Sequence, residues 1–304
     1  MTGIYLKLVA SMALWGGTWV SGRVLAQSLH PFSAAFLRFL FASVFLYFFS
    51  CRAEGHWPRF PRAQWKGVLF LALTGVLFYN YFFFAGLSHI GAGRAALIVA
   101  CVPSTVALYS ALFLRAPLTA LKSLGIALSL SGVAVILSHG DVPALLSQGV
   151  GTGEAFILCC VVLWAAYSLG GASVMRKVSA LSAVTWSCIL GTALLLPPAL
   201  GAGMLRQAAE AGWLVWGNLL YLGVAATGLA YTWYYDGILA IGASRASIFI
   251  NLVPVFAAVL SAALLGESLD LSVILGGAMV ITGVTLANRP AKARAEAPQP
   301  PEAR

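Results

Sequence analysis

Aromatic side chains that recur at helical spacing are the residues of this chain with the clearest capacity to bind a ligand. Trp15 and Trp19 lie four residues apart, so a helix would place both rings on one face. Further rings, with a serine and an asparagine, cluster in later apolar stretches: Phe78, Tyr79, Phe82, Phe83, Trp164, Tyr167, Ser168, Tyr231, Tyr234 and Asn251. Such rings can line a pocket for an apolar ligand, while hydroxyls and free carbonyls bind its polar end. We therefore predict a substrate-binding pocket, with packing or an interfacial belt as the alternative.

Arg38 is the main ionisable residue inside an apolar stretch, where a charged side chain has a functional role by default. It is a candidate contact for a substrate carboxylate. Snorkelling to the membrane interface, or a structural hydrogen bond, is the alternative account. The acids Glu154, Asp236, Glu267 and Asp270 all fall near the ends of stretches. No acid stands in the middle of a stretch, which weakens any scheme of ion coupling through a buried carboxylate.

Two prolines, Pro103 and Pro254, fall within apolar stretches that otherwise read as continuous helices. Each lacks an N–H group and releases the carbonyl four residues earlier, at Val99 and Ile250. In lipid such a carbonyl needs a partner, so each break should face protein or a water-filled cavity. We predict kinks that assist gating, with static kinks as the alternative. Asn251 can either bind substrate or satisfy the freed backbone near Pro254.

The composition excludes most soluble classes of protein. Of 304 residues, 61% are hydrophobic and 9% are charged, and the mean hydropathy is +0.91. Soluble domains carry about 25% charged residues. The net charge of +9 comes from residues scattered among apolar stretches, so no nucleic-acid partner is expected. The four histidines lie in or beside loops and no metal motif is present, so we expect no enzyme, no metal site and no cofactor.

Ten apolar stretches must position these residues, and a helix needs about 20 residues to cross the bilayer core. The stretches are about 3–25, 31–50, 65–87, 92–114, 119–138, 151–174, 180–202, 212–235, 243–265 and 270–288. They are continuous and long, unlike the short alternating strands of a membrane barrel. We predict an all-α membrane protein with ten transmembrane helices. The tail at 289–304 is rich in Pro, Ala and charge, and we expect it to be disordered.

Lysine and arginine concentrate in alternate loops, and this distribution predicts the orientation in the membrane. The richer loops and the tail hold Arg52, Arg59, Arg62, Lys66, Arg115, Lys122, Arg176, Lys177, Arg245, Arg289, Lys292 and Arg294. The opposite loops hold little beyond Arg23, Arg94 and Arg206. The positive-inside rule places the richer set in the cytoplasm. We expect a multi-pass protein of the bacterial inner membrane with both termini cytoplasmic.

The chain is self-similar at an offset of 151 residues. The segment at 86–95 aligns with 237–246, and about 18 of the 48 positions from 86 to 133 match their partners. We therefore divide the chain into a five-helix repeat at 1–138, a periplasmic linker at 139–150 and a second five-helix repeat at 151–288. An odd number of helices inverts the second copy in the membrane. Many secondary transporters have this architecture and bind substrate between the halves.

Four short motifs resemble the EamA type of the drug/metabolite transporter superfamily. They are residues 13–16 (ALWG), residues 36–39 (FLRF), the repeated Ile-Gly-Ala-x-Arg-Ala turn with a proline nine residues after its arginine, and the pair Gly266–Glu267. The resemblance covers residues 1–288 and is strongest to bacterial amino-acid exporters. It implies a ten-helix exporter of amino acids, other metabolites or cationic drugs. The first half has Arg115–Ala116 in place of the Gly-Glu pair, so no shared role for that acid is implied there.

The sequence thus favours a secondary transporter that exports amino acids, aromatic or neutral ones above all, by alternating access. The absence of an acid within a span favours zwitterionic amino acids over drugs and organic cations, which are the alternative within the same fold. A channel and a membrane-embedded enzyme are the alternatives of other classes. The expected partners are a small-molecule substrate and the lipid bilayer, and a monomer is compatible with the sequence.

Overall fold

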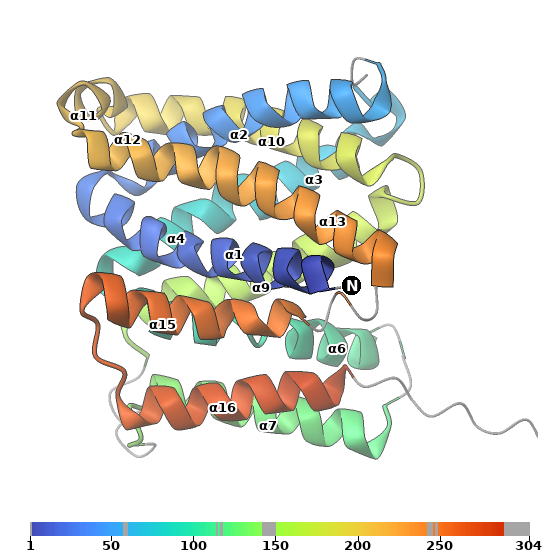
Figure 1. Cartoon of the computed structure of the whole chain (residues 1–304), viewed down its shortest axis with the longest axis vertical. Coiled ribbons are helices and arrows are strands. Elements are labelled where there is room, and N and C mark those ends of the chain that lie inside the picture. The colour runs from blue at the N-terminus through green and yellow to red at the C-terminus, as the bar shows by residue number, and fades with distance from the viewer. Residues whose placement is uncertain are drawn as a thin grey trace, which may run out of the picture.

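The computed structural model describes residues 2–56, 60–113, 115, 118–141, 150–241, 246 and 249–288. Within these ranges every regular element is a helix and no strand is present. The long helices lie roughly side by side in a layered bundle (Figure 1). The predicted all-α fold is therefore confirmed.

The first half of the chain contains the following elements, among which α1 carries Trp15, α2 carries Arg38 and α4 carries Tyr79. They are α1 (Thr2–Ser28), α2 (Pro31–Glu54), the short 3-10 turn η1 (Arg62–Gln64), α3 (Trp65–Leu71), the π-helical segment η2 (Ala72–Phe78), α4 (Tyr79–His89), α5 (Ala92–Val99), α6 (Val102–Phe113) and α7 (Ala120–Leu137). Segment η2 joins α3 to α4 without a gap, so the three form one long helix with a widened middle.

The second half repeats much of this order. Its elements are α9 (Thr152–Val174), α10 (Ala180–Gly201), the short α11 (Met204–Glu210), α12 (Trp213–Leu220), the π-helical segment η3 (Tyr221–Leu229), α13 (Ala230–Ile241), the 3-10 turn η4 (Phe249–Leu252), α15 (Val253–Leu265) and α16 (Leu271–Ala287). Segment η3 joins α12 to α13 as η2 joins α3 to α4. Both halves thus contain one long helix with a π-helical middle.

Six helical segments of the described chain, some of them made of several of these elements, are long and apolar enough to cross a membrane. They span Pro31–Glu54, Arg62–His89, Ala92–Phe113, Ala120–Leu137, Thr152–Val174 and Leu181–Gly201. Shorter apolar helices cover Trp213–Thr227, Phe249–Leu265 and Leu271–Ala287. Helix α1 has 27 residues but carries Lys7 and Arg23, which make it less apolar. These elements fit a multi-pass membrane protein.

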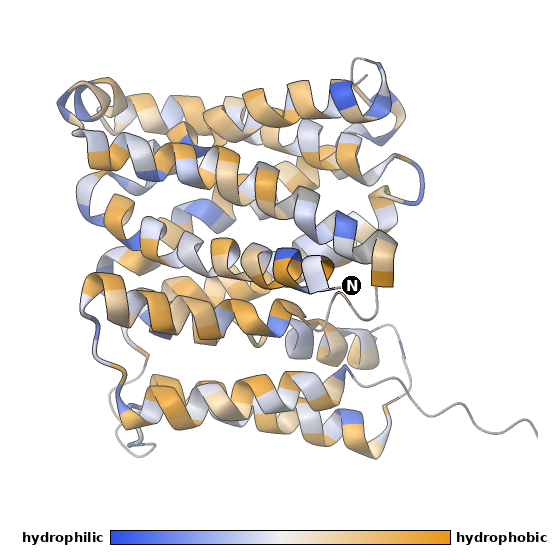
Figure 2. Cartoon of the chain, viewed as in Figure 1, coloured by the Kyte–Doolittle hydropathy of each residue, from blue (hydrophilic) through white to orange (hydrophobic). Residues whose placement is uncertain are grey.

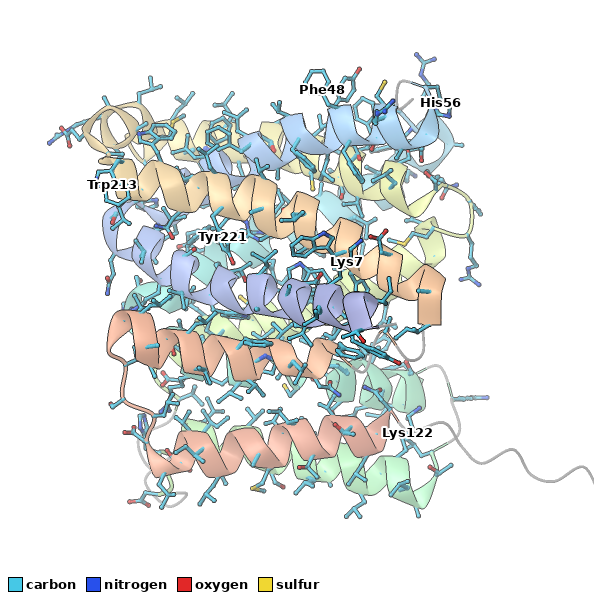
Figure 3. All side chains as sticks on the ribbon, viewed as in Figure 1. Lys7, Phe48, His56, Lys122, Trp213 and Tyr221 are labelled. Atoms are coloured by element: carbon cyan, nitrogen blue, oxygen red, sulfur yellow. The ribbon has the colours of Figure 1, made fainter. Side chains whose placement is uncertain are left out.

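The outer surface of the bundle is apolar, as expected for contact with lipid. Hydrophobic residues dominate the middle of the helices, and hydrophilic ones gather near their ends (Figure 2). Phe48 is 60% exposed and Trp213 is 84% exposed, and both side chains point away from the bundle (Figure 3). A soluble protein rarely exposes large apolar side chains over so much of its surface.

Helices α7 and α16 form a close pair at one side of the bundle, and glycines make that approach possible (Figure 1). A Cβ atom at Gly132 would stand 2.6 Å from the carbonyl oxygen of Gly276, and one at Gly283 would stand 2.4 Å from the amide nitrogen of Ser129. Small residues of this kind let two helix backbones touch within a membrane. The α7–α16 pair is therefore scaffold, built by backbone contact.

The remaining long helices pack around a common interior, largely across the two halves of the chain. Helix α2 packs on α10, α1 packs on α15 and α13, and α4 packs on α9. Their ends are defined by local signals. The Ser179 hydroxyl accepts from the amide of Ser182 at the start of α10, while Gly55, with φ +73°, ends α2. The aromatic residues singled out above lie on these inward-facing helices.

Both prolines lie at a short interruption within one apolar helical segment, Ala92–Phe113 for Pro103 and Phe249–Leu265 for Pro254, and a role of these sites in gating stays a prediction. Helix α5 ends at Val99 and α6 starts at Val102, so Pro103 occupies the first turn of a new helix. Pro254 likewise lies in the first turn of α15, directly after the turn η4. Proline suits this position because its missing N–H would have no partner there and its φ is already helical.

Candidate functional site

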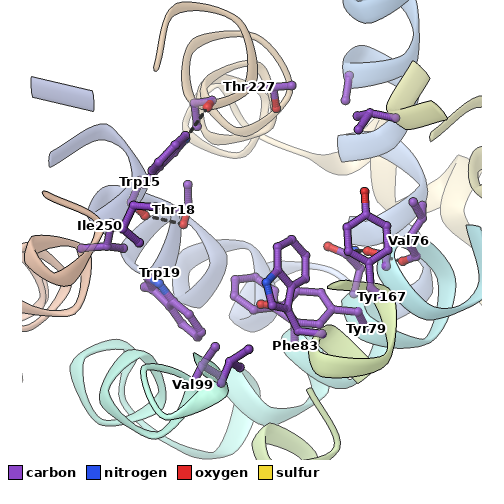
Figure 4. A pocket seen from close by; sticks show the side chains of 18 of the residues that line it. Trp15, Thr18, Trp19, Val76, Tyr79, Phe83, Val99, Tyr167, Thr227 and Ile250 are labelled. Carbon is purple, nitrogen blue, oxygen red and sulfur yellow. Dashed lines mark hydrogen bonds between the residues drawn. The ribbon is translucent and has the colours of Figure 1, made fainter. Parts of the chain in front are cut away.

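A cavity of about 520 Å³ lies in the middle of the bundle, between the two halves of the chain. One part of its wall comes from α1, α2, η2, α4 and the α5–α6 break, and the other from α9, α10, η3, η4, α15 and α16. Figure 4 shows the rings and hydroxyls that face the open space. The size suits a small organic molecule.

Aromatic rings form most of one face of the cavity. The Trp164 ring lies 5.0 Å from the ring of Tyr79 and 5.1 Å from that of Tyr167, centre to centre. The Trp19 ring lies 5.1 Å from that of Phe83 (Figure 4). These distances are typical of stabilising ring pairs. The stack therefore gives the cavity a rigid apolar wall for a flat or bulky side chain.

The opposite aromatic side chain, Trp15, is fixed by a hydrogen bond to the second half of the chain. Its indole Nε1 donates to the carbonyl oxygen of Ala226, in η3, over 3.0 Å, and its ring lies 5.2 Å from that of Tyr234. A buried indole N–H normally needs such an acceptor. Tyr234 packs behind Trp15, so it supports the wall of the cavity.

The π-helical segments η2 and η3 both contribute to the wall, through Gly75 and Val76 in one and Ala226 and Thr227 in the other. A Cβ atom at Gly75 would stand 2.3 Å from the Tyr167 ring, so only glycine lets that ring pack here. π-Helical turns widen a helix locally and are frequent at functional sites. Here they place small residues in the cavity wall, and the carbonyls of Gly75, Val76 and Ala226 accept hydrogen bonds from Asn80 and Trp15.

Arg38 brings a positive charge into the cavity wall, seven residues into α2. Its Nη1 donates to the Oδ1 atom of Asn80 over 3.0 Å. Its guanidinium carbon lies 5.3 Å from the centre of the Phe39 ring and 5.7 Å from that of Phe83, within cation–π range. Among the cavity-lining residues that the structure describes, Arg38 is the one with a charged side chain.

Most of the predicted site residues meet in this cavity. Those that line it are Trp15, Trp19, Tyr79, Phe83, Trp164, Tyr167, Asn251, Pro103, Pro254 and Arg38. Val99 and Ile250, whose carbonyls the prolines were expected to release, also lie in its wall (Figure 4). The amide of Asn251 donates to the Thr285 hydroxyl over 3.3 Å, which ties the turn η4 to α16.

Other predicted residues lie outside the cavity wall. Phe78 is 44% exposed, because it precedes Tyr79 and Phe83 by one and five positions and so points to another side of the helix. Phe82 packs against Phe156, and the Ser168 hydroxyl donates to the Trp164 carbonyl over 2.7 Å. The side chain of Tyr231 lies outside the described residues.

Sequence reasoning missed Asn80, which is 1% exposed and fixes the orientation of Arg38. The available signal was an amide in the middle of an apolar stretch, since a polar group there is costly unless it is bonded. The small hydroxyl residues Thr18 and Thr227 also line the cavity and were missed. Nothing in their local sequence distinguishes them from ordinary helix residues.

A second, polar cavity of about 760 Å³ opens at the end of the bundle opposite to the start of α1. Two ion pairs lie beside it. The Arg94 Nε is 3.1 Å from the Glu154 Oε1, with both side chains 10% exposed, and the Arg23 Nε is 3.9 Å from the Glu267 Oε1. We call these four residues the charged cluster. Glu267 also accepts the backbone N–H groups of Ala92 and Gly93 at the start of α5, over 3.0 and 3.3 Å.

The charged cluster joins helices that are far apart in the sequence. Arg94 links α5 to α9. Its Nη2 atom also donates to the carbonyl oxygens of Ile136 and Leu137, at the end of α7. Arg23 and Glu267 link the end of α1 to the segment between α15 and α16. The sequence placed Arg94 among the few basic residues of one set of loops and Glu154 near the end of an apolar stretch. The structure shows the two as one buried ion pair that joins α5 to α9 at this end of the bundle.

Comparison with known proteins identifies the family. A family model described as "EamA-like transporter family" matches residues 2–138 and again residues 151–289. "Uncharacterized transporter YyaM" from Bacillus subtilis (strain 168) is 26% identical over 285 residues, covering 94% of this chain and 93% of the relative. An "Uncharacterized transporter" from Archaeoglobus fulgidus is 28% identical over 286 residues, covering 93% and 96%.

The name of a further relative states a substrate class. A "Probable terminal-alkyne amino-acid exporter" from Streptantibioticus cattleyicolor is 28% identical over 285 residues, covering 93% of this chain and 92% of the relative. A solved crystal structure superposes with a TM-score of 0.59 at 19% identity and covers 94% of this chain and 98% of its own, which shows a shared fold. Since the family model matches nearly the whole chain in two segments, the chain belongs to the EamA-like transporter family.

Proposed function

We propose that the protein exports amino acids, aromatic and neutral ones above all, across the bacterial inner membrane by alternating access. The observation that carries the proposal is the central cavity, which lies between the halves and combines an aromatic wall with one cationic side chain, Arg38, among its described residues. An aromatic amino acid matches both features. Its ring fits the wall of Trp164, Tyr79 and Tyr167, and its carboxylate complements the guanidinium.

Two inverted five-helix repeats, ten spans in all, provide the architecture for this proposal. The two segments matched by the family model support it, as does the pairing of helices at equivalent places: α2 packs on α10, and α7 packs on α16. The paired π-helical segments η2 and η3 occupy equivalent places too. Such internal symmetry gives a carrier two related conformations, one open to each side.

The direction of opening follows from the contents of the two ends. The central cavity extends along α2, α10 and α16 through Phe49, Leu181 and Val284, which lie toward the end where α1 begins. The opposite end carries the charged cluster. With both termini in the cytoplasm, as the lysine and arginine distribution favours, this conformation gives access from the cytoplasm and is closed toward the periplasm.

A drug or other organic cation is the second candidate substrate, since aromatic walls also bind cations. The residues described in the cavity wall include no acid to pair with such a cation, and Arg38 would repel it. The name of the Streptantibioticus cattleyicolor relative, a probable amino-acid exporter, also favours amino acids. We therefore rank amino acids first.

Counterflow into proteoliposomes tests the proposal. Purified protein is reconstituted into liposomes loaded with unlabelled phenylalanine, and labelled phenylalanine is added outside. A carrier gives a transient, saturable accumulation of label that protein-free liposomes lack. Absence of exchange for every neutral or aromatic amino acid would overturn the proposed substrate, and a steady ion current in place of saturable exchange would indicate a channel.

A further inference from the structure

We infer that the central cavity recognises the carboxylate of its substrate through Arg38 oriented by Asn80, and that it does not require the amino group. Aromatic monocarboxylates without an amine, such as 3-phenylpropionate, then belong to the substrate class together with aromatic amino acids. This inference rests on the proposed function of the cavity. It goes further because it separates the two charged ends of an amino acid and assigns a positioning role to Asn80.

Asn80 is held in one orientation by the π-helical segment. Its Nδ2 atom donates to the carbonyl oxygens of Gly75 and Val76, over 3.1 and 2.9 Å. Both protons of the amide are thereby used, so the Oδ1 atom must face the other way, where it accepts from Arg38 over 3.0 Å. A flipped amide would set its oxygen against two carbonyl oxygens, which is unfavourable. The backbone of η2 therefore fixes the acceptor that positions the guanidinium.

The rings of Phe39 and Phe83 restrict Arg38 further. The guanidinium carbon lies 5.3 and 5.7 Å from their centres, and both side chains also line the cavity. Seven residues of helix separate Arg38 from the start of α2, a rise of about 10 Å. With its head group bonded to Asn80, the side chain stays at the cavity and does not snorkel to the nearest interface. The sequence left open whether Arg38 contacts a substrate carboxylate or makes a structural hydrogen bond. Both roles are compatible here, since the hydrogen bond to Asn80 keeps the guanidinium at the cavity.

The two ends of an amino acid would meet unequal surroundings in this cavity. A carboxylate near Arg38 gains a full opposite charge in a wall of low polarity, where such an interaction is strong. An ammonium group finds no acid among the described lining residues, only ring faces and neutral oxygens. Two of those oxygens are the hydroxyls of Thr18 and Thr227, which donate to the carbonyls of Trp15 and Leu222 and can accept from an ammonium group, but they carry no opposite charge. The carboxylate of the substrate therefore determines which ligands bind in the cavity, and the amino group contributes little to the binding free energy.

Competition among three ligands that share one ring tests the inference. Phenylalanine carries both charges, 3-phenylpropionate carries only the carboxylate, and 2-phenylethylamine carries only the ammonium. Each is added to proteoliposomes during counterflow of labelled phenylalanine. We expect 3-phenylpropionate to inhibit within about threefold of phenylalanine, and 2-phenylethylamine to be at least about tenfold weaker, the ratio that one charge-assisted hydrogen bond supplies.

Asn80→Asp supplies the second test. The new carboxylate would pair with Arg38 and neutralise it, so both carboxylate ligands should weaken by about tenfold while 2-phenylethylamine binds as well as before or better. The matched control is Asn218→Asp, because Asn218 lies on α12 away from the cavity and bonds only the carbonyl of Leu214 among the described contacts. The control should leave the order of the three ligands unchanged. A general loss of folding would weaken all three ligands alike, so the split between them reports positioning.

The outcomes separate the inference from the function on which it rests. If the wild-type protein exchanges phenylalanine but 2-phenylethylamine competes as well as 3-phenylpropionate, the inference fails and amino-acid transport stands. If Asn80→Asp weakens all three ligands equally, Asn80 has only a structural role and the inference also fails. If no ligand with this ring exchanges or competes, the proposed function itself fails.

Discussion

A few side chains determine the character of the cavity: aromatic rings form an apolar wall, and Arg38 brings a positive charge to another part of the wall. The stack of Tyr79, Trp164 and Tyr167 is rigid because each ring is held by its neighbour at about 5 Å. Arg38 is held from another direction by Asn80. A ligand that contacts both features is oriented before any helix moves. Substitutions in one wall should therefore change a different property from substitutions in the other.

Trp164→Ala tests the apolar wall. The change removes the ring between Tyr79 and Tyr167 and the apolar area that a substrate ring would cover. We expect the half-saturating concentration of phenylalanine in counterflow to rise about tenfold, with a smaller effect on a short substrate such as alanine. The control is Trp213→Ala, since Trp213 is 84% exposed at the periphery of the bundle. Equal effects of the two substitutions would place the substrate elsewhere.

Much of this residue-level arrangement could be predicted from the sequence. Trp15, Trp19 and Trp164 lie mid-stretch, away from the interfaces where aromatic residues gather for other reasons, and spacing alone puts them on common faces. Phe78 shows the limit of this reasoning. A run of adjacent rings surrounds the helix, and only tertiary packing decides which ring faces inward. An asparagine at position 80, in the middle of an apolar stretch, could have been recognised as a site residue. Its hydrogen bonds could not be predicted, because they depend on a π-helical turn that the local sequence does not indicate.

The helices set the spacing of these residues. Among the helix pairs that the structure describes, α7 and α16 pack most closely. Glycines on both helices let the two backbones meet, so the pair can serve as a fixed support beside the cavity. Glycines at equivalent places in both halves, such as Gly132 and Gly283, allow this packing. The sequence predicted an irregular helix at Pro103 and Pro254 from the N–H group that each proline lacks, but it does not show how far the chain turns there.

Gly132→Leu should disrupt the α7–α16 pair. The new side chain would start 2.6 Å from the carbonyl oxygen of Gly276, which is backbone and cannot move aside alone. Overpacking of this kind costs about 1–3 kcal/mol, so the thermal midpoint of the detergent-solubilised protein should fall by several degrees. Gly217→Leu is the matched control, since a Cβ atom there meets nothing within 4 Å. An unchanged midpoint in Gly132→Leu would show that the pair is looser than described.

At the scale of the whole molecule, the halves are joined differently at the two ends of the bundle. One end holds the buried Arg94–Glu154 pair together with Arg23 and Glu267. The other holds the pair of Lys7 and Asp236, 2.6 Å apart, whose side chains are 43% and 37% exposed. An exposed pair is worth little, whereas an unpaired buried charge is costly. In the proposed transport cycle, the charged cluster therefore stabilises the conformation that is closed toward the periplasm.

Glu154→Gln should destabilise this closed conformation. Removing one partner leaves the Arg94 charge buried without its carboxylate, at a cost of about 3 kcal/mol. We expect a lower thermal midpoint, and partial recovery in the double variant Arg94→Gln with Glu154→Gln. Glu210→Gln provides the control, because the Arg206–Glu210 pair lies on the surface with side chains 84% and 63% exposed. If Glu154→Gln and Glu210→Gln behave alike, the charged cluster does not hold the bundle closed.

The central claim is that one cavity becomes accessible from each side of the membrane in turn, and thiol labelling tests it most directly. Ala100 lines the cavity, so Ala100→Cys is made in a variant whose native cysteines, Cys51, Cys101, Cys159, Cys160 and Cys188, are replaced by alanine. An impermeant reagent should label it readily from the cytoplasmic side and slowly from the periplasmic side. Glu154→Gln should raise periplasmic labelling and lower cytoplasmic labelling. Rapid labelling from both sides at once, unaffected by Glu154→Gln, would contradict alternating access.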